Sequence, residues 1–466
     1  MSANCQIPTP KEYVNMLLDS AGYTNNLYGK KILENSFGEG NILKVIVRRY
    51  IVDAIRHKKS NEEIAYGLEC DILGYEIDQK CVSKCKEALD SIAKEYSLRK
   101  INWRLYEADY LESENEKVDF IIGNPPYITY HDLEEEKRNF IKMKFSTCKR
   151  GRCDYYYAFI EKSVQSLSKN GILAYLIPFN IFRNKYAEQT RKLLKPHIKK
   201  IFDYSEMEVF PRITIASTII VYDMSYDGDK IVYKKVKEGI NKEISKDELG
   251  QKWIFSSNND KVDRFGDHFS VSNSIATLLN EAFIIKDYSE DEKFTYVDGY
   301  KIENNILKYA TSPRMMKKNA ICKIIFPYKL ENNVYSRYEE EEFKMFFPEA
   351  YKYLKQFKSK LKKRKVLEET HWFEYGRTQA ISNMEGEKLI LPMVISKRVQ
   401  SYIIKFDVIP FAGYFIKRRE GGRYSLNDAK KILDDKSFMR YVKEHGTPTT
   451  KTSFRISVKD IEEYKF

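Results

Sequence analysis

The chain has 466 residues, of which 42% are hydrophobic and 32% are charged, a composition typical of a globular protein with several domains. No segment approaches the roughly 18 consecutive apolar residues that a membrane-spanning helix needs. The N-terminus has neither the basic head nor the apolar core of a secretion signal. We therefore expect a cytoplasmic protein with no membrane partner.

The net charge of +13 is unevenly distributed along the chain. Residues 1–225 carry about +3 and the remainder about +10. This favours a near-neutral part that performs chemistry and a basic part that binds a polyanion. The seven cysteines include no C-x-x-C pair, and the six histidines are scattered, so we expect neither a disulfide framework nor a metal site.

Short apolar runs alternate with amphipathic stretches over the first 225 residues, which is typical of a parallel α/β sheet. Helices are predicted over Asn41–Ile55, Val82–Tyr96, Tyr156–Leu167 and Lys185–Leu194. No helix separates the last two strands, which predicts an antiparallel hairpin at one sheet edge. The predicted strands are Lys31–Glu34, Ile72–Ile77, Trp103–Glu107, Val118–Ile122, Gly171–Ile177, Ile201–Tyr204 and Ile215–Tyr222.

The polar turn at residues 226–229 predicts a domain boundary, with domains 1–226 and 227–466. Beyond it the periodicity is weaker. Lys352–Lys365 is predicted as a helix with a basic outer face and Leu426–Leu433 as a second helix. Short strands are predicted at Leu389–Ile395, Tyr402–Phe406 and Gly413–Ile416. Basic residues interleaved with Trp372, Tyr375 and Tyr402 suit contacts to phosphates and bases.

The sharpest motif is Asn124-Pro125-Pro126-Tyr127, which directly follows the apolar strand at 118–122. Open α/β sheets bind ligands at this end of their strands. Two prolines remove two backbone donors, so the Asn124 side-chain oxygen and the Pro125 carbonyl remain as acceptors. Two acceptors on a planar amino group favour a localised lone pair that can attack an electrophilic methyl group. Tyr127 would stack on the base that carries this nitrogen.

The motif resembles the catalytic motif of amino-group methyltransferases. The order of motifs resembles the gamma class of DNA adenine-N6 methyltransferases, the TaqI-like enzymes of bacterial restriction–modification systems, over nearly the whole chain. The resemblance implies a Rossmann-like seven-stranded catalytic domain and a mixed α+β target-recognition domain. It also implies S-adenosylmethionine as cofactor, no metal, and double-stranded DNA whose target adenine is rotated out of the duplex.

The resemblance assigns further residues to the cofactor. Thr9 would be the N-cap, and Pro10 the first residue, of a helix beside it. The glycine-rich segment 33–40 contributes Glu34, Ser36 and Gly38, with Glu34 facing the cofactor's ammonium group. Glu76 would accept hydrogen bonds from the ribose hydroxyls of the cofactor, with Ile77 beside it. Asp109 would accept from the cofactor's adenine amino group, with Tyr110 beside it. Phe210 would pack on the flipped base, on the side opposite Tyr127.

Alternative functions remain open. The same motif serves enzymes that methylate RNA or a protein glutamine amide, and cytosine N4 is a possible target in place of adenine N6. A catalytically silent nucleic-acid-binding protein is the third alternative, although the intact motifs disfavour it. Because the first motif starts at Thr9, we expect no fused nuclease and no cleavage activity. We expect a monomer, with any restriction endonuclease encoded separately.

Overall fold

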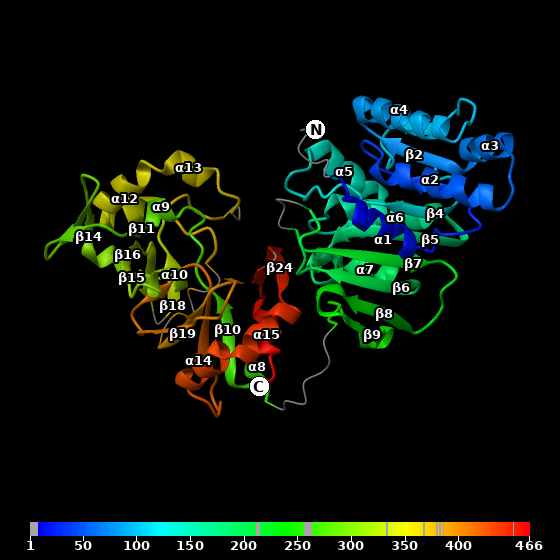
Figure 1. Cartoon of the computed structure of the whole chain (residues 1–466). Coiled ribbons are helices and arrows are strands. Elements are labelled where there is room, and N and C mark those ends of the chain that lie inside the picture. Colours follow the sequence, from blue (N-terminus) through cyan, green and yellow to red (C-terminus); the bar gives the residue numbers. More distant parts are fainter. Residues whose placement is uncertain are drawn as a thin grey trace. The chain divides into compact units, whose positions relative to one another are not determined.

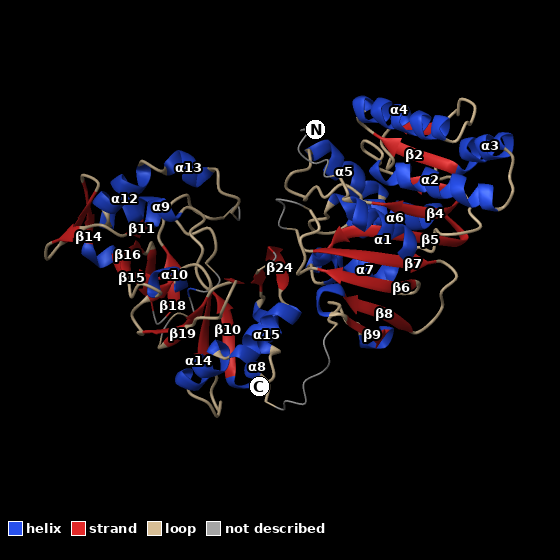
Figure 2. Ribbon diagram, in the orientation of Figure 1, coloured by secondary structure: helices blue, strands red, loops and turns tan. Residues whose placement is uncertain are grey.

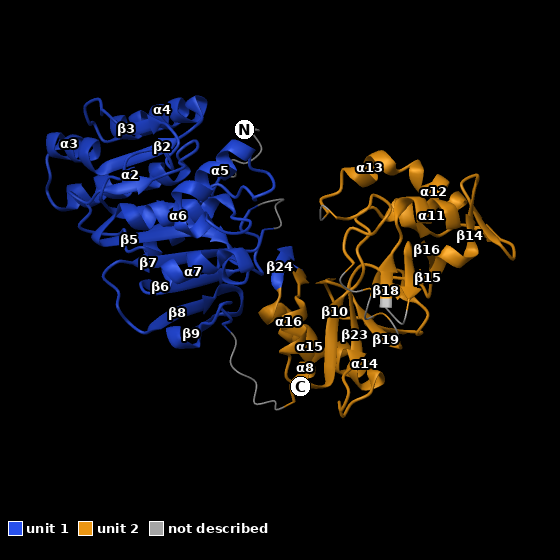
Figure 3. Ribbon diagram, turned by 180° about the vertical axis from the view of Figure 1, so that it is seen from behind, with its two compact units in different colours: residues 1–256, 447–452 blue, residues 257–446, 453–466 orange. Residues whose placement is uncertain are grey.

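The computed structural model describes residues 8–210, 215–255, 263–331, 334–366, 369–378, 381, 384, 386–450 and 452–466. The chain divides into two compact units, coloured separately in Figure 3. Unit 1 comprises residues 1–256 and 447–452, and unit 2 comprises residues 257–446 and 453–466. No helix among the described residues is long and apolar enough to cross a membrane.

Unit 1 is built on a nine-stranded sheet with the strand order β3-β2-β1-β4-β5-β7-β6-β8-β9 (Figure 1). The strands from β3 to β5 are parallel, and β7 is antiparallel to both of its neighbours. The strands are β1 Ile32–Glu34, β2 Ile72–Glu76, β3 Arg104–Glu107, β4 Val118–Gly123, β5 Leu167–Pro178, β6 Ile198–Tyr204, β7 Ser217–Asp223, β8 Lys230–Lys235 and β9 Ile240–Ser245.

Helices cover both faces of this sheet (Figure 2). Successive strand residues belong to different hydrophobic cores: Ile32 belongs to the core that includes residues of α1 to α4, and Leu33 to the core that includes residues of α6 and α7. This follows from the two-residue repeat of a strand, which turns neighbouring side chains to opposite faces. The helices are α1 Lys11–Ser20, α2 Asn41–Arg56, α3 Asn61–Asp71, α4 Gln79–Glu95, α5 Glu135–Lys144, α6 Tyr155–Ser166 and α7 Glu188–Leu194.

All seven predicted strands form, but three expectations were wrong: the position of the hairpin, the domain boundary and the number of strands. β6 and β7 pair antiparallel as predicted, yet they do not lie at the sheet edge, because β8 and β9 continue the sheet beyond β6. The polar turn at 226–229 is therefore not a domain boundary. It joins β7 to β8, which pairs parallel with β6, and the sheet has nine strands instead of seven.

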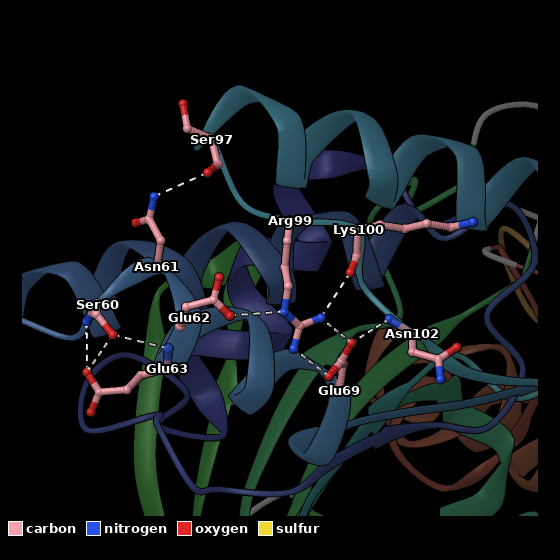
Figure 4. Close-up of polar contacts among 9 residues, drawn as sticks. All are labelled: Ser60, Asn61, Glu62, Glu63, Glu69, Ser97, Arg99, Lys100 and Asn102. Atoms are coloured by element: carbon pink, nitrogen blue, oxygen red, sulfur yellow. Dashed lines mark hydrogen bonds and ion pairs between the residues drawn. The ribbon is translucent and has the colours of Figure 1, made fainter.

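Polar contacts tie α3 to the segment that leads into β3 (Figure 4). A capping box opens the helix, with Ser60 and Glu63 satisfying each other's backbone N–H groups. Arg99 then donates to Glu62 at 3.2 Å and to both oxygens of Glu69 at 2.7 and 2.9 Å. These contacts fix α3 against the strand edge that carries β2 and β3.

Unit 2 combines short helices with small sheets, of which two have four strands, β10-β23-β19-β21 and β11-β16-β15-β22. Its helices are α8 Phe265–His268, α9 Asn280–Phe283, α10 Pro313–Met316, α11 Glu340–Phe346, α12 Pro348–Lys355, α13 Lys358–Lys362, α14 Leu426–Asp434, α15 Lys436–His445 and α16 Val458–Glu462. Its main strands are β10 Phe269–Asn273, β11 Ile284–Ile285, β13 Phe294–Val297, β14 Tyr300–Glu303, β15 Leu307–Thr311, β16 Cys322–Ile325, β17 Tyr328–Glu331, β18 Val334–Arg337, β19 Lys388–Leu391, β21 Tyr402–Ile404, β22 Ile409–Pro410 and β23 Tyr414–Arg418.

Several expectations for the second half need correction. The helix predicted over Lys352–Lys365 is two helices, α12 and α13, separated at residues 356–357. Trp372 and Tyr375 are core residues, with exposed fractions of 8% and 0%, so their rings are not available to stack on bases. Both lie in the continuous buried run of residues 372–375.

The disulfide expectation was also wrong, because Cys148 and Cys153 are bonded to each other. Their C-x₄-C spacing matches no recognised signature, so the pairing could not be predicted. Cys70, Cys81, Cys85 and Cys322 take part in no disulfide among the described residues.

Candidate active site

The carboxyl ends of β1, β2 and β4 border a cavity of about 940 Å³ in unit 1. Twelve of the thirteen residues assigned from the sequence line it: Thr9, Glu34, Ser36, Gly38, Glu76, Ile77, Asp109, Tyr110, Asn124, Pro125, Pro126 and Tyr127. Phe210 is the exception. Parallel strands bring their carboxyl ends to one edge of a sheet, which is why motifs up to 115 residues apart in the chain converge here.

Asn124 is held from two sides at the end of β4. Its Nδ2 donates to Thr9 Oγ1 at 3.2 Å, and its backbone carbonyl accepts from Ser36 Oγ at 3.2 Å. The side-chain Oδ1 is buried and has no hydrogen-bond partner among the described residues. A buried acceptor left without a partner is costly in a folded protein, so each such group needs an explanation, and a catalytic role is one.

Thr9 differs from its predicted role. Helix α1 begins at Lys11, Pro10 occupies the N-cap position, and no side chain caps the helix. The Thr9 hydroxyl accepts from Asn124 instead of from the helix backbone. The threonine–proline pair therefore joins the start of α1 to the catalytic motif.

Tyr127 is fixed by its hydroxyl and by two neighbouring rings. The hydroxyl donates to the Leu176 carbonyl of β5 at 2.8 Å. Tyr156 lies edge-on to the Tyr127 ring with centroids 6.2 Å apart, and Phe210 lies edge-on at 6.3 Å. Phe210 is only 1% exposed, so in this structure it supports Tyr127 from within the core.

Glu34 is a buried carboxyl at the end of β1, with an exposed fraction of 2%. Burial raises its pKa well above the ordinary value, opposed by a backbone hydrogen bond at Leu43, and the nearby Glu76 raises it further. Its Oε2 has no partner among the described residues. The Glu34 carboxyl can therefore accept a hydrogen bond from a cationic group of a ligand.

Glu76 closes the neighbouring side of the cavity. Its Oε2 accepts from the Gly38 amide at 2.8 Å, and its Oε1 accepts from the amides of Ile77 and Asp78 at 2.9 and 3.1 Å. Gly40, which precedes α2, has a φ of +77°, and a Cβ there would lie 2.3 Å from Cys85 Sγ. The second glycine of the motif thus permits close packing of α2 on α4.

The sequence analysis missed the residues that surround Asp109. Asp109 Oδ2 accepts from Lys137 of α5 and, at 3.2 Å, from the hydroxyl of Tyr155 at the start of α6. Burial alone would lower the pKa of Lys137, but hydrogen bonds to Asp109 and Glu112 outweigh it and raise the pKa. Both Lys137 and Tyr155 line the cavity. No sequence signal distinguished this lysine from a solvated one.

A mostly parallel sheet with acidic side chains around a cavity at its strand ends is the arrangement of the doubly wound α/β class, whose members bind their ligands at this end of the strands. Residues 25–210 match the family described as Eco57I restriction-modification methylase. This part of the chain is an Eco57I restriction-modification methylase domain, and the restriction–modification methylase family expected from the sequence is confirmed for it.

Curated relatives agree with this assignment. The chain is 28% identical to the type II methyltransferase M.BstVI of Geobacillus stearothermophilus, over 48% of the chain and 42% of that protein. It is 30% identical to M.PaeR7I of Pseudomonas aeruginosa over 47% of the chain and 41% of that protein. The restriction enzyme and methyltransferase RM.Eco57I of Escherichia coli is 23% identical, over 71% of the chain and 38% of that protein. The chain thus spans less than half the length of these relatives.

Two solved structures share the fold over nearly the whole chain. The type IIL restriction-modification enzyme MmeI, determined in complex with DNA, aligns with a TM-score of 0.61 at 13% identity, covering 97% of this chain and 64% of that one. A nuclease-deletion mutant of the type ISP enzyme LlaGI aligns with a TM-score of 0.58 at 13% identity, covering 98% and 46%.

Proposed function

We propose that this chain is a site-specific DNA methyltransferase that transfers a methyl group from S-adenosylmethionine to the exocyclic amino group of a flipped-out base, adenine N6. The observation that carries the proposal is the buried Oδ1 of Asn124, a cavity-lining residue, which has no hydrogen-bond partner in the part of the chain that the structure describes. The relatives, which are named as type II methyltransferases, support the reaction.

The cavity fits S-adenosylmethionine by the chemistry of its lining. The cofactor presents three kinds of donor, namely an ammonium group, ribose hydroxyls and an adenine amino group. The cavity offers the carboxylates of Glu34, Glu76 and Asp109 as acceptors, and its volume lies in the usual range for ligand sites. When bound, the cofactor supplies an electrophilic methyl group.

The protein's own part in the reaction is positioning and electrostatics. Asn124 Oδ1 and the Pro125 carbonyl accept the two amino hydrogens of the base, which localises the nitrogen lone pair. Thr9 holds the Asn124 amide so that Nδ2 points away from the base. Tyr127, whose hydroxyl is fixed on Leu176, stacks on the base and restricts its motion. In this proposal Phe210 acts by supporting Tyr127.

The test is methyl transfer from a labelled cofactor to unmodified bacterial DNA, followed by hydrolysis of the DNA and identification of the methylated base. N6-methyladenine supports the proposal, and N4-methylcytosine would change only the target base. Cofactor binding without transfer to DNA would overturn it. Transfer to RNA or to a protein glutamine would favour the alternatives.

The other predictions from the sequence stand as proposals of the same kind. They are a cytoplasmic location, a target-recognition role for unit 2, a monomeric state and a separately encoded restriction endonuclease. The exposed cations Arg377, Lys397 and Arg398 of unit 2 are the candidates there for phosphate contacts.

A further inference from the structure

Residues 149–152 form a basic loop whose ends are joined by the Cys148–Cys153 disulfide. The loop reads Lys149-Arg150-Gly151-Arg152, and all four residues are exposed, whereas both cysteines are buried. The bond anchors the two ends of the loop in the core and restricts the conformations that the tip can adopt. Three cations are thus presented on a short, restrained segment.

A second segment completes the basic surface. Gly151 has a φ of +79°, and a Cβ at this position would lie 2.3 Å from Cδ1 of Tyr186. The Tyr186 ring, 36% exposed, therefore lies against the loop tip. It follows the exposed Lys185 in the 3-10 helix η4, Lys185–Ala187. We call Lys149, Arg150, Arg152, Lys185 and Tyr186 the basic surface.

The side chains of the four cations of the basic surface have no hydrogen bond or ion pair among the described residues. In this respect they differ from most of their neighbours: Lys137 pairs with Asp109, Lys144 donates to the Leu111 carbonyl, and Lys192 pairs with Glu188. Exposed cations that gather without acidic partners favour binding of a polyanion.

The basic surface is also connected to the catalytic motif. Asp154 follows Cys153 directly and, with Tyr127 and Tyr156, lines a second cavity of about 240 Å³. Arg152 lies four positions before Tyr156, whose ring contacts Tyr127, and four residue steps span at most about 14 Å. The surface is therefore within a few nucleotides' length of a base held at Tyr127.

We propose that the basic surface binds the phosphate backbone of double-stranded DNA beside the target base, with Tyr186 packing on the sugar–phosphate chain. The inference rests on the proposed function and deepens it, because it assigns DNA contacts to the catalytic unit in addition to unit 2. Phosphate contacts position the duplex without reading its sequence, so the surface determines affinity and register but not the recognition site.

The experiment compares the triple variant Lys149→Gln, Arg150→Gln, Arg152→Gln in the full chain with a matched control. The control, Arg56→Gln, Lys94→Gln, Lys100→Gln, removes the same charge from exposed positions on α2, α4 and the segment before β3. Binding of a fluorescent duplex is measured as a function of salt, and methyl transfer and cofactor binding are measured in parallel.

We expect the loop variant to bind DNA at least tenfold more weakly at moderate salt. The slope of log affinity against log salt should fall by about 2 to 3, since each phosphate contact contributes about 0.9. Cofactor affinity and the rate at saturating DNA should match wild type, and the control should retain the wild-type slope. Equal slopes for wild type, loop variant and control would overturn the inference while leaving the proposed function intact. A wild-type protein that binds DNA with this salt dependence but transfers no methyl group would overturn the proposed function alone.

Discussion

Thr9 Oγ1 accepts a hydrogen bond from Asn124 Nδ2 at 3.2 Å, across 115 residues of sequence. The contact engages the amide nitrogen of Asn124, whereas the side-chain Oδ1 is buried and has no partner among the described residues. It links the first described helix to the motif that we propose as the centre of the reaction.

Replacing Thr9 by valine should lower kcat, because the Asn124 amide loses the acceptor that orients it. One lost hydrogen bond costs about 1 kcal/mol, which corresponds to a fall of roughly tenfold or less. Thr9→Ser retains the hydroxyl and should retain most of the activity. Steady-state methyl transfer measures the effect. Equal activity of the valine and serine variants would show that the amide is oriented by something else.

Cofactor affinity should rise with pH through the range in which Glu34 titrates. Burial raises the pKa of this carboxyl, so the free protein holds it protonated above its ordinary range. An ammonium group favours the carboxylate, so binding releases a proton and becomes tighter as the pH rises towards the folded-state pKa. Calorimetry in buffers of different ionisation enthalpy measures the released proton. Glu34→Gln should bind more weakly and with no such release, and an unchanged proton release in this variant would contradict the account.

Removing the Lys137 side-chain charge should destabilise unit 1. Lys137→Met leaves Asp109, with a side-chain exposure of 14%, without its cation, and we expect a loss of roughly 2 kcal/mol in the free energy of unfolding. Lys94→Met, at an exposed position, should change the free energy of unfolding by less than about 0.5 kcal/mol. Urea denaturation compares the two. Similar unfolding midpoints for both variants would show that the Lys137–Asp109 pair does not stabilise the fold.

The Cys148–Cys153 bond should contribute roughly 2 kcal/mol to stability, the value expected for closing a loop of this length. The double variant Cys148→Ser, Cys153→Ser should therefore have a lower Tm than wild type. Adding reductant should lower the Tm of wild type to that of the variant and should leave the Tm of the variant unchanged. Cys70→Ser, which removes a free thiol, serves as the control. A variant whose Tm also falls in reductant would contradict the assignment.

Much of unit 1 could be predicted from the sequence, because its strands are apolar runs that end where a motif begins. The run before Asn124 is an example: β4 is buried and its end leads directly into the cavity. The two strands at the edge of the sheet could not be predicted in this way. β8 and β9 are polar, lysine-containing strands behind a turn-forming segment, so hydrophobic periodicity gave no reason to add them.

The site was predictable where a residue type is tied to chemistry and not where it depends on packing. Glu34, Glu76 and Asp109 converge as their motif order predicted. The roles of Thr9 and Phe210 depend on contacts with Asn124 and Tyr127 that only the folded chain creates. The same holds for the lysine partner of Asp109 and for the bonded pair of cysteines.

The most direct test of the account is a single-turnover measurement of methyl transfer to DNA by Asn124→Ala beside wild type, with cofactor affinity measured on both proteins. Loss of a preorganised acceptor predicts a fall of about 10² to 10³ in the rate of transfer with an unchanged cofactor Kd. An Asn124→Ala protein that methylates DNA at the wild-type rate would contradict the central claim that the Asn124 amide oxygen activates the amino group of the base.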